Sequence, residues 1–186
     1  MSKDKTKVSK TLSYILRHKP EKFGIKLDKH GWANISDILI KLDVDLDTIK
    51  DVVSSCDKQR FQLSDDISKI RASQGHTIKV DVQLKKCTPP IKLYHGTKSQ
   101  FIDDIMKDGL KPMRRQHVHL SKDLETAEKV SSRRKGDSII LEISARQMML
   151  DGLDIYISQN GVYLTEYVPS VYLTEYVPSD NIRKLL

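Results

Sequence analysis

Two consecutive prolines, Pro89 and Pro90, interrupt the chain between two stretches with different hydropathy patterns. Proline lacks a backbone N–H, so the segment KKCTPP at 85–90 cannot lie inside a helix or a central strand. Apolar residues recur at helical spacing before this segment and in short, alternating runs after it. We therefore expect an α+β protein with two domains, residues 1–86 and 91–186.

The first domain is predicted to contain three helices and then a hairpin, which is the winged-helix arrangement. Asn34 is the expected N-cap of the second helix, with Asp37 in the capping-box position. The alternating apolar residues of TIKVDVQL, at 77–84, predict one further strand. The predicted helices and hairpin strands are 8–18, a helix that begins near Asn34, 45–55, 60–63 and 69–72.

The second domain is expected to be largely β, with short strands separated by short helices. It contains the nonapeptide VYLTEYVPS twice in succession, at 162–170 and 171–179. A turn at Asn160-Gly161 precedes only the first copy and should feed a strand directly, so we expect that copy in the sheet. The second copy follows Pro169 and is expected to form a surface segment, an added edge strand or a tail.

The net charge of +7 is concentrated in the first part of the chain. Residues 1–88 hold 18 Lys and Arg against 12 Asp and Glu, whereas residues 89–186 hold 14 against 13. This distribution favours a polyanionic partner for the first domain. No apolar run is long enough to span a membrane, and the two cysteines show no CxxC spacing. Since the charged N-terminus lacks a secretory signal, we expect a cytoplasmic protein.

Several motifs carry side chains suited to chemistry. Arg17 and His18 end the first helix just before Pro20, where the helix dipole favours cations or where the two side chains are aimed at an anion. His117 and His119 share one face of a predicted strand, but zinc needs three or four ligands and no other ligand lies at suitable spacing. We therefore expect no metal. A G-x-S-x-G elbow, a P-loop and a G-x-G-x-x-G fingerprint are also missing from the sequence.

A series of seven short motifs occurs between residues 8 and 168. In order, they are LRHKP, GW, K-x-RF, IRA-x-QGH, LYHGT, HVHLS and NGVYL. This series closely resembles the RNA 2′-phosphotransferase (KptA) family, whose members use NAD⁺ to remove an internal 2′-phosphate from spliced tRNA. Their reaction forms an ADP-ribosylated RNA 2′-phosphate, and it releases nicotinamide and ADP-ribose 1″,2″-cyclic phosphate. The resemblance implies a winged-helix lobe followed by an ADP-ribosyltransferase-like, β-rich lobe.

The resemblance also implies a catalytic tetrad of Arg17, His18, Arg71 and Arg133, with the adjacent Arg134 as the alternative fourth member. Planar, permanently charged guanidinium groups suit this role because they bind phosphate oxygens in pairs. His18 would donate a hydrogen bond to the phosphate or transfer a proton. Further candidates for contact with RNA are Lys58, Arg60, Gln74 and His76.

Two further motifs resemble the NAD⁺-binding motifs of ADP-ribosyltransferases. Gly96 would permit close approach of the backbone to the dinucleotide. Val162 stands where many protein-modifying relatives have a glutamate, which argues against protein ADP-ribosylation. The residues implied to bind NAD⁺ are His95, Gly96, Thr97, His119, Ser121 and Val162.

Two other functions remain open from the sequence. One is an ADP-ribosyltransferase that caps phosphorylated nucleic-acid ends and stops after the first step. The other is a winged-helix regulator that binds nucleic acid and senses a ligand with its second lobe. For the favoured function we expect RNA with an internal 2′-phosphate and NAD⁺ as partners, no membrane association, and a monomer.

Overall fold

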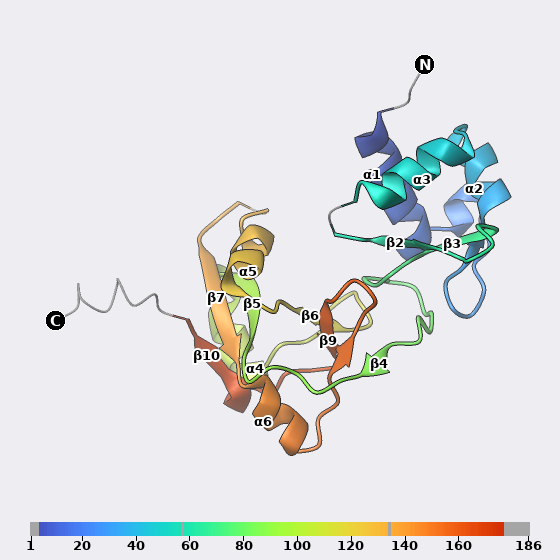
Figure 1. Ribbon diagram of the computed structural model, residues 1–186. Coiled ribbons are helices and arrows are strands. Elements are labelled where there is room, and N and C mark those ends of the chain that lie inside the picture. The colour runs from blue at the N-terminus through green and yellow to red at the C-terminus, as the bar shows by residue number, and fades with distance from the viewer. Residues whose placement is uncertain (1–3, 57, 134, 177–186) are drawn as a thin grey trace. The chain divides into compact units, whose positions relative to one another are not determined.

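A computed structural model of the protein describes residues 4–56, 58–133 and 135–176. The expected α+β class is confirmed, because helices and antiparallel sheets occur in both of its compact units (Figure 1). Two short segments from later in the chain pack with the first unit. The first unit comprises Met1–Leu84, Met113–Gln116 and Ser158–Asn160, and the second comprises Lys85–Pro112, His117–Ile157 and Gly161–Leu186.

The first unit contains three α-helices and a three-stranded antiparallel sheet with strand order β1-β3-β2. The β2–β3 hairpin aligns Phe61 with Ala72, which places both of these buried residues in the core. The elements are α1 (Lys5–Arg17), η1 (Glu21–Phe23), β1 (Ala33–Asn34), α2 (Ile35–Leu42), α3 (Leu46–Ser54), β2 (Phe61–Leu63) and β3 (Lys69–Ala72).

Helix α1 forms because its apolar residues recur every three or four positions and its ends are capped. The carboxylate of Asp4 accepts a hydrogen bond from the Thr6 N–H, 2.9 Å away, at the start of the helix. The buried face packs against α3 and the sheet and consists of Val8, Leu12, Ile15 and Leu16. His18 is the C-cap residue, so the core contacts of α1 determine where Arg17 and His18 lie.

The start of α2 differs in one detail from the predicted capping box. Asn34 is the N-cap residue, but its side chain makes no capping hydrogen bond. The backbone of Asn34 is instead part of β1 and pairs with Lys69. Asp45 shows the bond that Asn34 lacks, since its carboxylate accepts from the Thr48 N–H at 2.7 Å.

The strand predicted for 77–84 was wrong. Burial does alternate there, with Val80 buried between two exposed neighbours, but the segment joins no sheet. Gln83 has a φ of 58°, and its N–H binds the Asp81 carboxylate at 2.9 Å in a local turn. The Thr77 and Asp81 N–H groups donate to the carbonyls of Arg17 and Lys29, both at 2.9 Å. These partners belong to two separate segments, so no continuous strand ladder forms.

The second unit contains two antiparallel sheets, ordered β10-β7-β5 and β4-β8-β9-β6. A bridge between Tyr94 and Ser121 links β5 to the end of β6. In Figure 1, α5 lies along β5 and β7, in agreement with their contacts. The elements are β4 (Lys85–Lys86), β5 (Leu93–Lys98), η2 (Ser99–Phe101), α4 (Ile102–Asp108), β6 (Val118–Leu120), α5 (Leu124–Ser131), β7 (Ser138–Ile143), α6 (Ala145–Leu150), β8 (Tyr156–Ile157), β9 (Tyr163–Thr165), η3 (Ser170–Tyr172) and β10 (Leu173–Glu175).

The two copies of VYLTEYVPS occupy different sheets. The first copy forms β9, in the interior of its sheet, as its preceding turn predicted. The described part of the second copy includes β10, which is the added edge strand that was one of the expected outcomes. Leu173 of β10 pairs with Ile143 and is buried in the core of the second unit. Residues 177–179 of the second copy lie outside the described residues.

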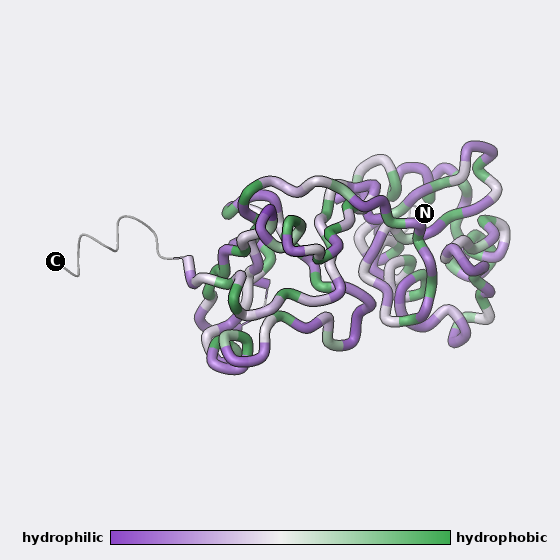
Figure 2. Tube along the Cα trace, turned by 90° about the horizontal axis from the view of Figure 1, so that it is seen from below, coloured by the Kyte–Doolittle hydropathy of each residue, from purple (hydrophilic) through white to green (hydrophobic). Residues whose placement is uncertain are grey.

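Apolar residues lie in short stretches that alternate with polar ones along the described chain, as the green and purple segments in Figure 2 show. Each unit therefore assembles its core from several elements rather than from one long apolar segment. None of the described helices has the length and apolarity that crossing a membrane requires.

Candidate functional site

Arg17 is held at the end of α1 by contacts on several sides. Its Nη2 donates to the Arg60 carbonyl at 3.4 Å, while the Thr77 N–H donates to the Arg17 carbonyl at 2.9 Å. Burial, and then the charges of Arg60 and Arg115, lower the pKa of Arg17 to about 10. It is still cationic at pH 7, and its buried Nε has no hydrogen-bond partner within the described part of the chain. Arg17 therefore has unused capacity to donate to an anion.

His18 lies beside this guanidinium group. Its Nδ1 lies 3.1 Å from the Thr77 hydroxyl, whose oxygen lies 3.4 Å from the Arg17 carbonyl. When the Thr77 hydroxyl donates to that carbonyl, it accepts from His18 Nδ1, and the ring then carries its proton on Nδ1. Partial burial and the charges of Arg17 and Arg115 lower the pKa of His18, which favours the neutral ring at pH 7. In the neutral tautomer with its proton on Nδ1, Nε2 is the proton acceptor.

Arg71 projects from β3 and is braced by three contacts. Its Nε donates to the Gln62 side chain at 2.7 Å, and its Nη1 donates to the His30 carbonyl at 3.4 Å. Its guanidinium carbon stands 4.4 Å from the centre of the Trp32 ring, within cation–π distance. The side chain is therefore held in one orientation before any ligand binds.

His76, of the QGH motif, is buried beside these cations. Burial, followed by the charges of Arg17, His18 and Arg71, lowers its pKa to about 4. It is therefore neutral at pH 7, and its buried Nε2 has no hydrogen-bond partner among the described residues. The His76 ring therefore adds no further charge to this group of cations.

Arg115 was not singled out in the sequence, yet its charge lowers the pKa of both Arg17 and His18. Its segment packs on the first unit through Gln116, whose N–H donates to the His76 carbonyl at 3.3 Å and whose amide donates to Val80 at 3.0 Å. Only this packing brings Arg115 near residues about a hundred positions earlier. We define the cation cluster as Arg17, Arg60, Arg71 and Arg115, together with His18 and His76.

Acidic side chains do not offset the positive charge of the cation cluster around Arg17 within the described residues. The carboxylates of Asp28 and Asp81 raise the pKa of Arg71, whereas among the described residues no carboxylate raises that of Arg17. Bringing like charges together costs free energy in the unliganded protein. A bound dianion such as a phosphate monoester would relieve that repulsion.

In the second unit, the residues expected to bind NAD⁺ lie on β5, at β6, and just before β9, which pairs with β6. His95 Nδ1 lies 2.9 Å from the His119 carbonyl, so the carbonyl accepts the hydrogen of Nδ1. Ser121 exchanges backbone hydrogen bonds with Tyr94, one residue before His95. Val162 directly precedes Tyr163, which pairs with Leu120. These hydrogen bonds hold the His95 ring and the end of β6 against β5.

Gly96 and Thr97 lie on opposite faces of β5. A β-carbon on Gly96 would overlap the backbone oxygen of Ala127 and lie 2.8 Å from the β-carbon of Ser131. Both residues belong to α5. The missing side chain of Gly96 is thus required by close helix packing, a role that the sequence did not indicate. Thr97 shares the other face with His95.

Arg133 follows the end of α5 in the second unit and is exposed. Its alternative, Arg134, lies outside the described residues. His117 is half-buried, and burial lowers its pKa. Within the described ranges, no three His, Cys, Asp or Glu side chains cluster in a way that could hold a metal ion.

Comparison with known proteins identifies the family. The sequence profile described as RNA 2′-phosphotransferase, Tpt1 / KptA family, matches residues 3–167. A "Probable RNA 2′-phosphotransferase" of Fusobacterium nucleatum is 44% identical over 169 residues, which covers 88% of this chain and 94% of that protein. A protein of the same name from Acaryochloris marina is 51% identical over 168 residues, covering 88% and 92%. This chain therefore belongs to the RNA 2′-phosphotransferase (Tpt1 / KptA) family.

Proposed function

We propose that this protein removes a 2′-phosphate from RNA and that NAD⁺ is its second substrate. The expected products are RNA with a free 2′-hydroxyl, nicotinamide, and ADP-ribose 1″,2″-cyclic phosphate. The observation that carries the proposal is the cation cluster, in which arginines converge on Arg17 without a described carboxylate to neutralise it. The chain's membership of the RNA 2′-phosphotransferase family supplies the substrate class.

The side chains of the first unit have complementary roles in this proposal. Arg17 and Arg71 bind the non-bridging oxygens of the 2′-phosphate and stabilise the charge that develops in the transition state. His18 is neutral and presents Nε2 as an acceptor. It accepts the proton of the hydroxyl group that attacks the phosphate and returns it to the departing 2′-oxygen of the RNA.

In the second unit we assign NAD⁺ binding to the region where β5 and the end of β6 are bridged. NAD⁺ supplies the ribose carbon and the ribose hydroxyl that react in turn with the phosphate. His95, Thr97, His119 and Ser121 would bind and orient it, with Val162 as an apolar neighbour that provides no catalytic carboxylate. Arg133, from the same unit, completes the proposed tetrad.

The fold classes implied by the resemblance are part of the same proposal. Three helices followed by an antiparallel hairpin support a winged-helix first unit. Two linked antiparallel sheets support an ADP-ribosyltransferase-like second unit.

The test is to incubate the protein with NAD⁺ and an oligoribonucleotide that carries one internal 2′-phosphate. We expect nicotinamide, dephosphorylated RNA and the cyclic phosphate in equal amounts, and equal rates with and without EDTA. Accumulation of ADP-ribosylated RNA without the cyclic phosphate would instead indicate a capping transferase. Binding of the RNA with no release of nicotinamide would indicate a regulator.

Replacement of Arg71 tests its assigned role. Arg71→Ala should lower kcat by at least about 100-fold, because a donor to the phosphate is lost. Arg71→Lys should restore little, since lysine cannot reproduce the paired contacts or the stacking on Trp32. Arg133→Ala should behave like Arg71→Ala. Near-normal turnover with unchanged melting temperatures in both alanine variants would contradict the tetrad assignment.

A further inference from the structure

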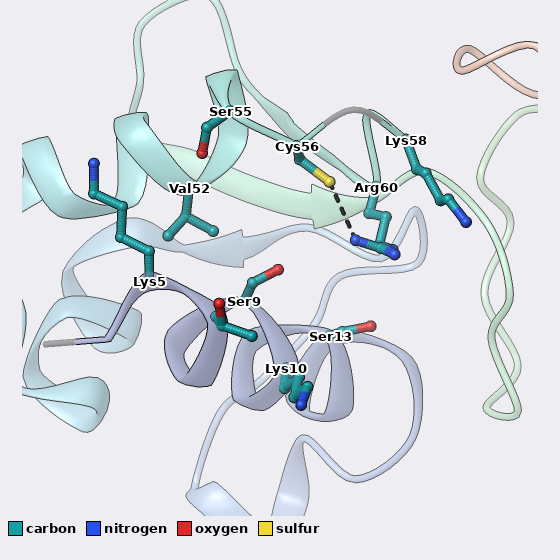
Figure 3. A pocket seen from close by; sticks show the side chains of 10 residues that line it. Lys5, Ser9, Lys10, Ser13, Val52, Ser55, Cys56, Lys58 and Arg60 are labelled. Carbon is teal, nitrogen blue, oxygen red and sulfur yellow. Dashed lines mark hydrogen bonds between the residues drawn. The ribbon is translucent and has the colours of Figure 1, made fainter. Parts of the chain in front are cut away.

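A groove of about 530 Å³ lies on the first unit between α1 and the segment that runs from the end of α3 into β2 (Figure 3). Its lining is polar and basic, with hydroxyl groups between the cationic side chains. We call it the α1–α3 groove. Its lining residues are Lys5, Thr6, Ser9, Lys10, Ser13, Val52, Ser55, Cys56, Lys58 and Arg60.

The groove adjoins the cation cluster at Arg60. The Arg60 carbonyl accepts from Arg17 Nη2 at 3.4 Å, and the Arg60 guanidinium donates to the sulfur of Cys56 at 3.4 Å. Residues at every fourth position of α1 lie in one row, so Lys5, Ser9 and Ser13 of the groove lead along the helix to Arg17. The groove and the proposed phosphate site therefore share one residue, Arg60, which lines the groove and binds Arg17.

The length of this row suits a short stretch of nucleic acid. Twelve residues separate Lys5 from Arg17, which at 1.5 Å per residue corresponds to about 18 Å. At the rise of about 3.4 Å per nucleotide in a stacked strand, this length accommodates about five nucleotides.

The chemistry of the lining also fits a phosphodiester backbone. Among the described residues that line the groove, four are cationic and none is acidic. Lys5 is paired with Asp51 at 2.8 Å, whereas the Arg60 guanidinium donates to the sulfur of Cys56 at 3.4 Å. Lysine, arginine and hydroxyl side chains are the usual donors to phosphate oxygens. The described lining has no aromatic side chain on which a base could stack, so the groove would contact backbone and not base sequence.

We propose that the α1–α3 groove binds the phosphodiester backbone of the RNA strand that flanks the 2′-phosphorylated nucleotide. The 2′-phosphate is bound at the cation cluster, and the flanking strand follows α1 through contacts with Lys10, Lys58 and Arg60. This inference rests on the proposed function for the identity of the strand. It adds a second binding element that makes affinity depend on RNA length.

The experiment compares the parent with the double variant Lys10→Gln/Lys58→Gln, using oligoribonucleotides of two to eight nucleotides that carry one 2′-phosphate. For the parent, KM should fall as the strand lengthens towards about five nucleotides and then level off. For the double variant, KM with the longest RNA should rise about tenfold, and the difference should shrink as the RNA is shortened. The control Lys22→Gln/Lys41→Gln has the same change in charge at exposed positions outside the groove, and it should behave like the parent.

Salt dependence gives a second readout that loss of folding would not mimic. Each phosphate contact on a single strand contributes a slope of about −0.7 in log K against log salt, so losing two contacts should reduce the slope by about 1.4. The proposal that the groove binds RNA would be overturned by KM values that are equal at all RNA lengths. A salt-dependence slope that is the same in the parent and the double variant would also overturn it. Tighter binding of poly-glutamate than of an RNA of equal charge would also overturn it, in favour of an acidic protein partner.

Failure of the proposed function can be recognised separately. If the parent leaves every 2′-phosphorylated RNA intact, the affinity for an octaribonucleotide without a 2′-phosphate is measured by fluorescence anisotropy. Weaker binding by the double variant than by the control variant would still support the groove. Equal binding by the two variants would overturn it.

Discussion

Replacing Gly96 with alanine distinguishes packing from cofactor approach as the reason for a glycine at this position. Strand β5 is paired with β7 along its whole length, from Leu93 to Lys98, so its backbone has little freedom to move. The new methyl group would point at α5, where it would overlap the backbone oxygen of Ala127. A backbone oxygen cannot rotate away as a flexible side chain could.

The cost follows from the displacement that α5 would need. The added carbon would lie 2.8 Å from the β-carbon of Ser131, whereas carbon atoms in ordinary contact are about 3.5–4.0 Å apart. Helix α5 must therefore move by at least about 0.7 Å, and further at Ala127. Overpacking of this kind typically costs about 1–3 kcal/mol, and we expect the upper end because backbone atoms are involved. Lower entropy of the unfolded chain offsets about 0.4–1 kcal/mol, which leaves a loss of about 2–3 kcal/mol.

The assay is thermal unfolding followed by circular dichroism. A loss of about 2–3 kcal/mol in a chain of this size should lower Tm by about 5–10 °C. Gly152→Ala is the control, because its added carbon meets no atom within 4 Å and its φ of 90° alone is strained. That variant should lose about 1 kcal/mol, because a left-handed backbone costs about 1–2 kcal/mol and the lower entropy of the unfolded chain offsets part of it. An unchanged Tm in Gly96→Ala together with lost NAD⁺ binding would refute the packing argument and restore the cofactor explanation.

Two further predictions concern pH and the repeated nonapeptide. The pKa of His76 is about 4 in the folded protein and about 6.5 in the unfolded chain. Between these pH values the unfolded chain binds more protons than the folded protein, so the stability falls as the pH is lowered from about 6.5 to about 4. Urea unfolding should show a loss of about 2 kcal/mol at pH 5 relative to pH 7, and a loss of the same size in His76→Leu would contradict this assignment. Deletion of 171–179 places Ile182 three residues after Ser170, where Leu173 now lies, so activity and Tm should change little. Truncation after Ser170 removes Leu173 without a substitute and should destabilise the protein by about 2 kcal/mol. Equal destabilisation by the deletion would show that Ile182 does not take the place of Leu173.

Local sequence was sufficient for the elements whose ends are determined by short-range interactions. The periodicity of α1 and the proline that follows it predicted that Arg17 and His18 would end a helix. The hairpin strand at 69–72 was likewise predicted with its observed bounds. The turn before the first nonapeptide correctly placed that copy in a sheet. In each case, hydrogen bonds and steric constraints within a few residues decide the outcome.

Tertiary structure decided the features that depend on distant partners. Residues 77–84 have the alternation of a strand, but their backbone N–H groups bind two separate segments, at Arg17 and Lys29, so no continuous ladder forms. The need for glycine at position 96 arises from α5, about thirty residues later, and not from the motif that contains it. Arg115 joins the cation cluster because its segment packs on the first unit. Long-range packing brings such groups together, and neither periodicity nor spacing in the sequence records which distant atoms will meet.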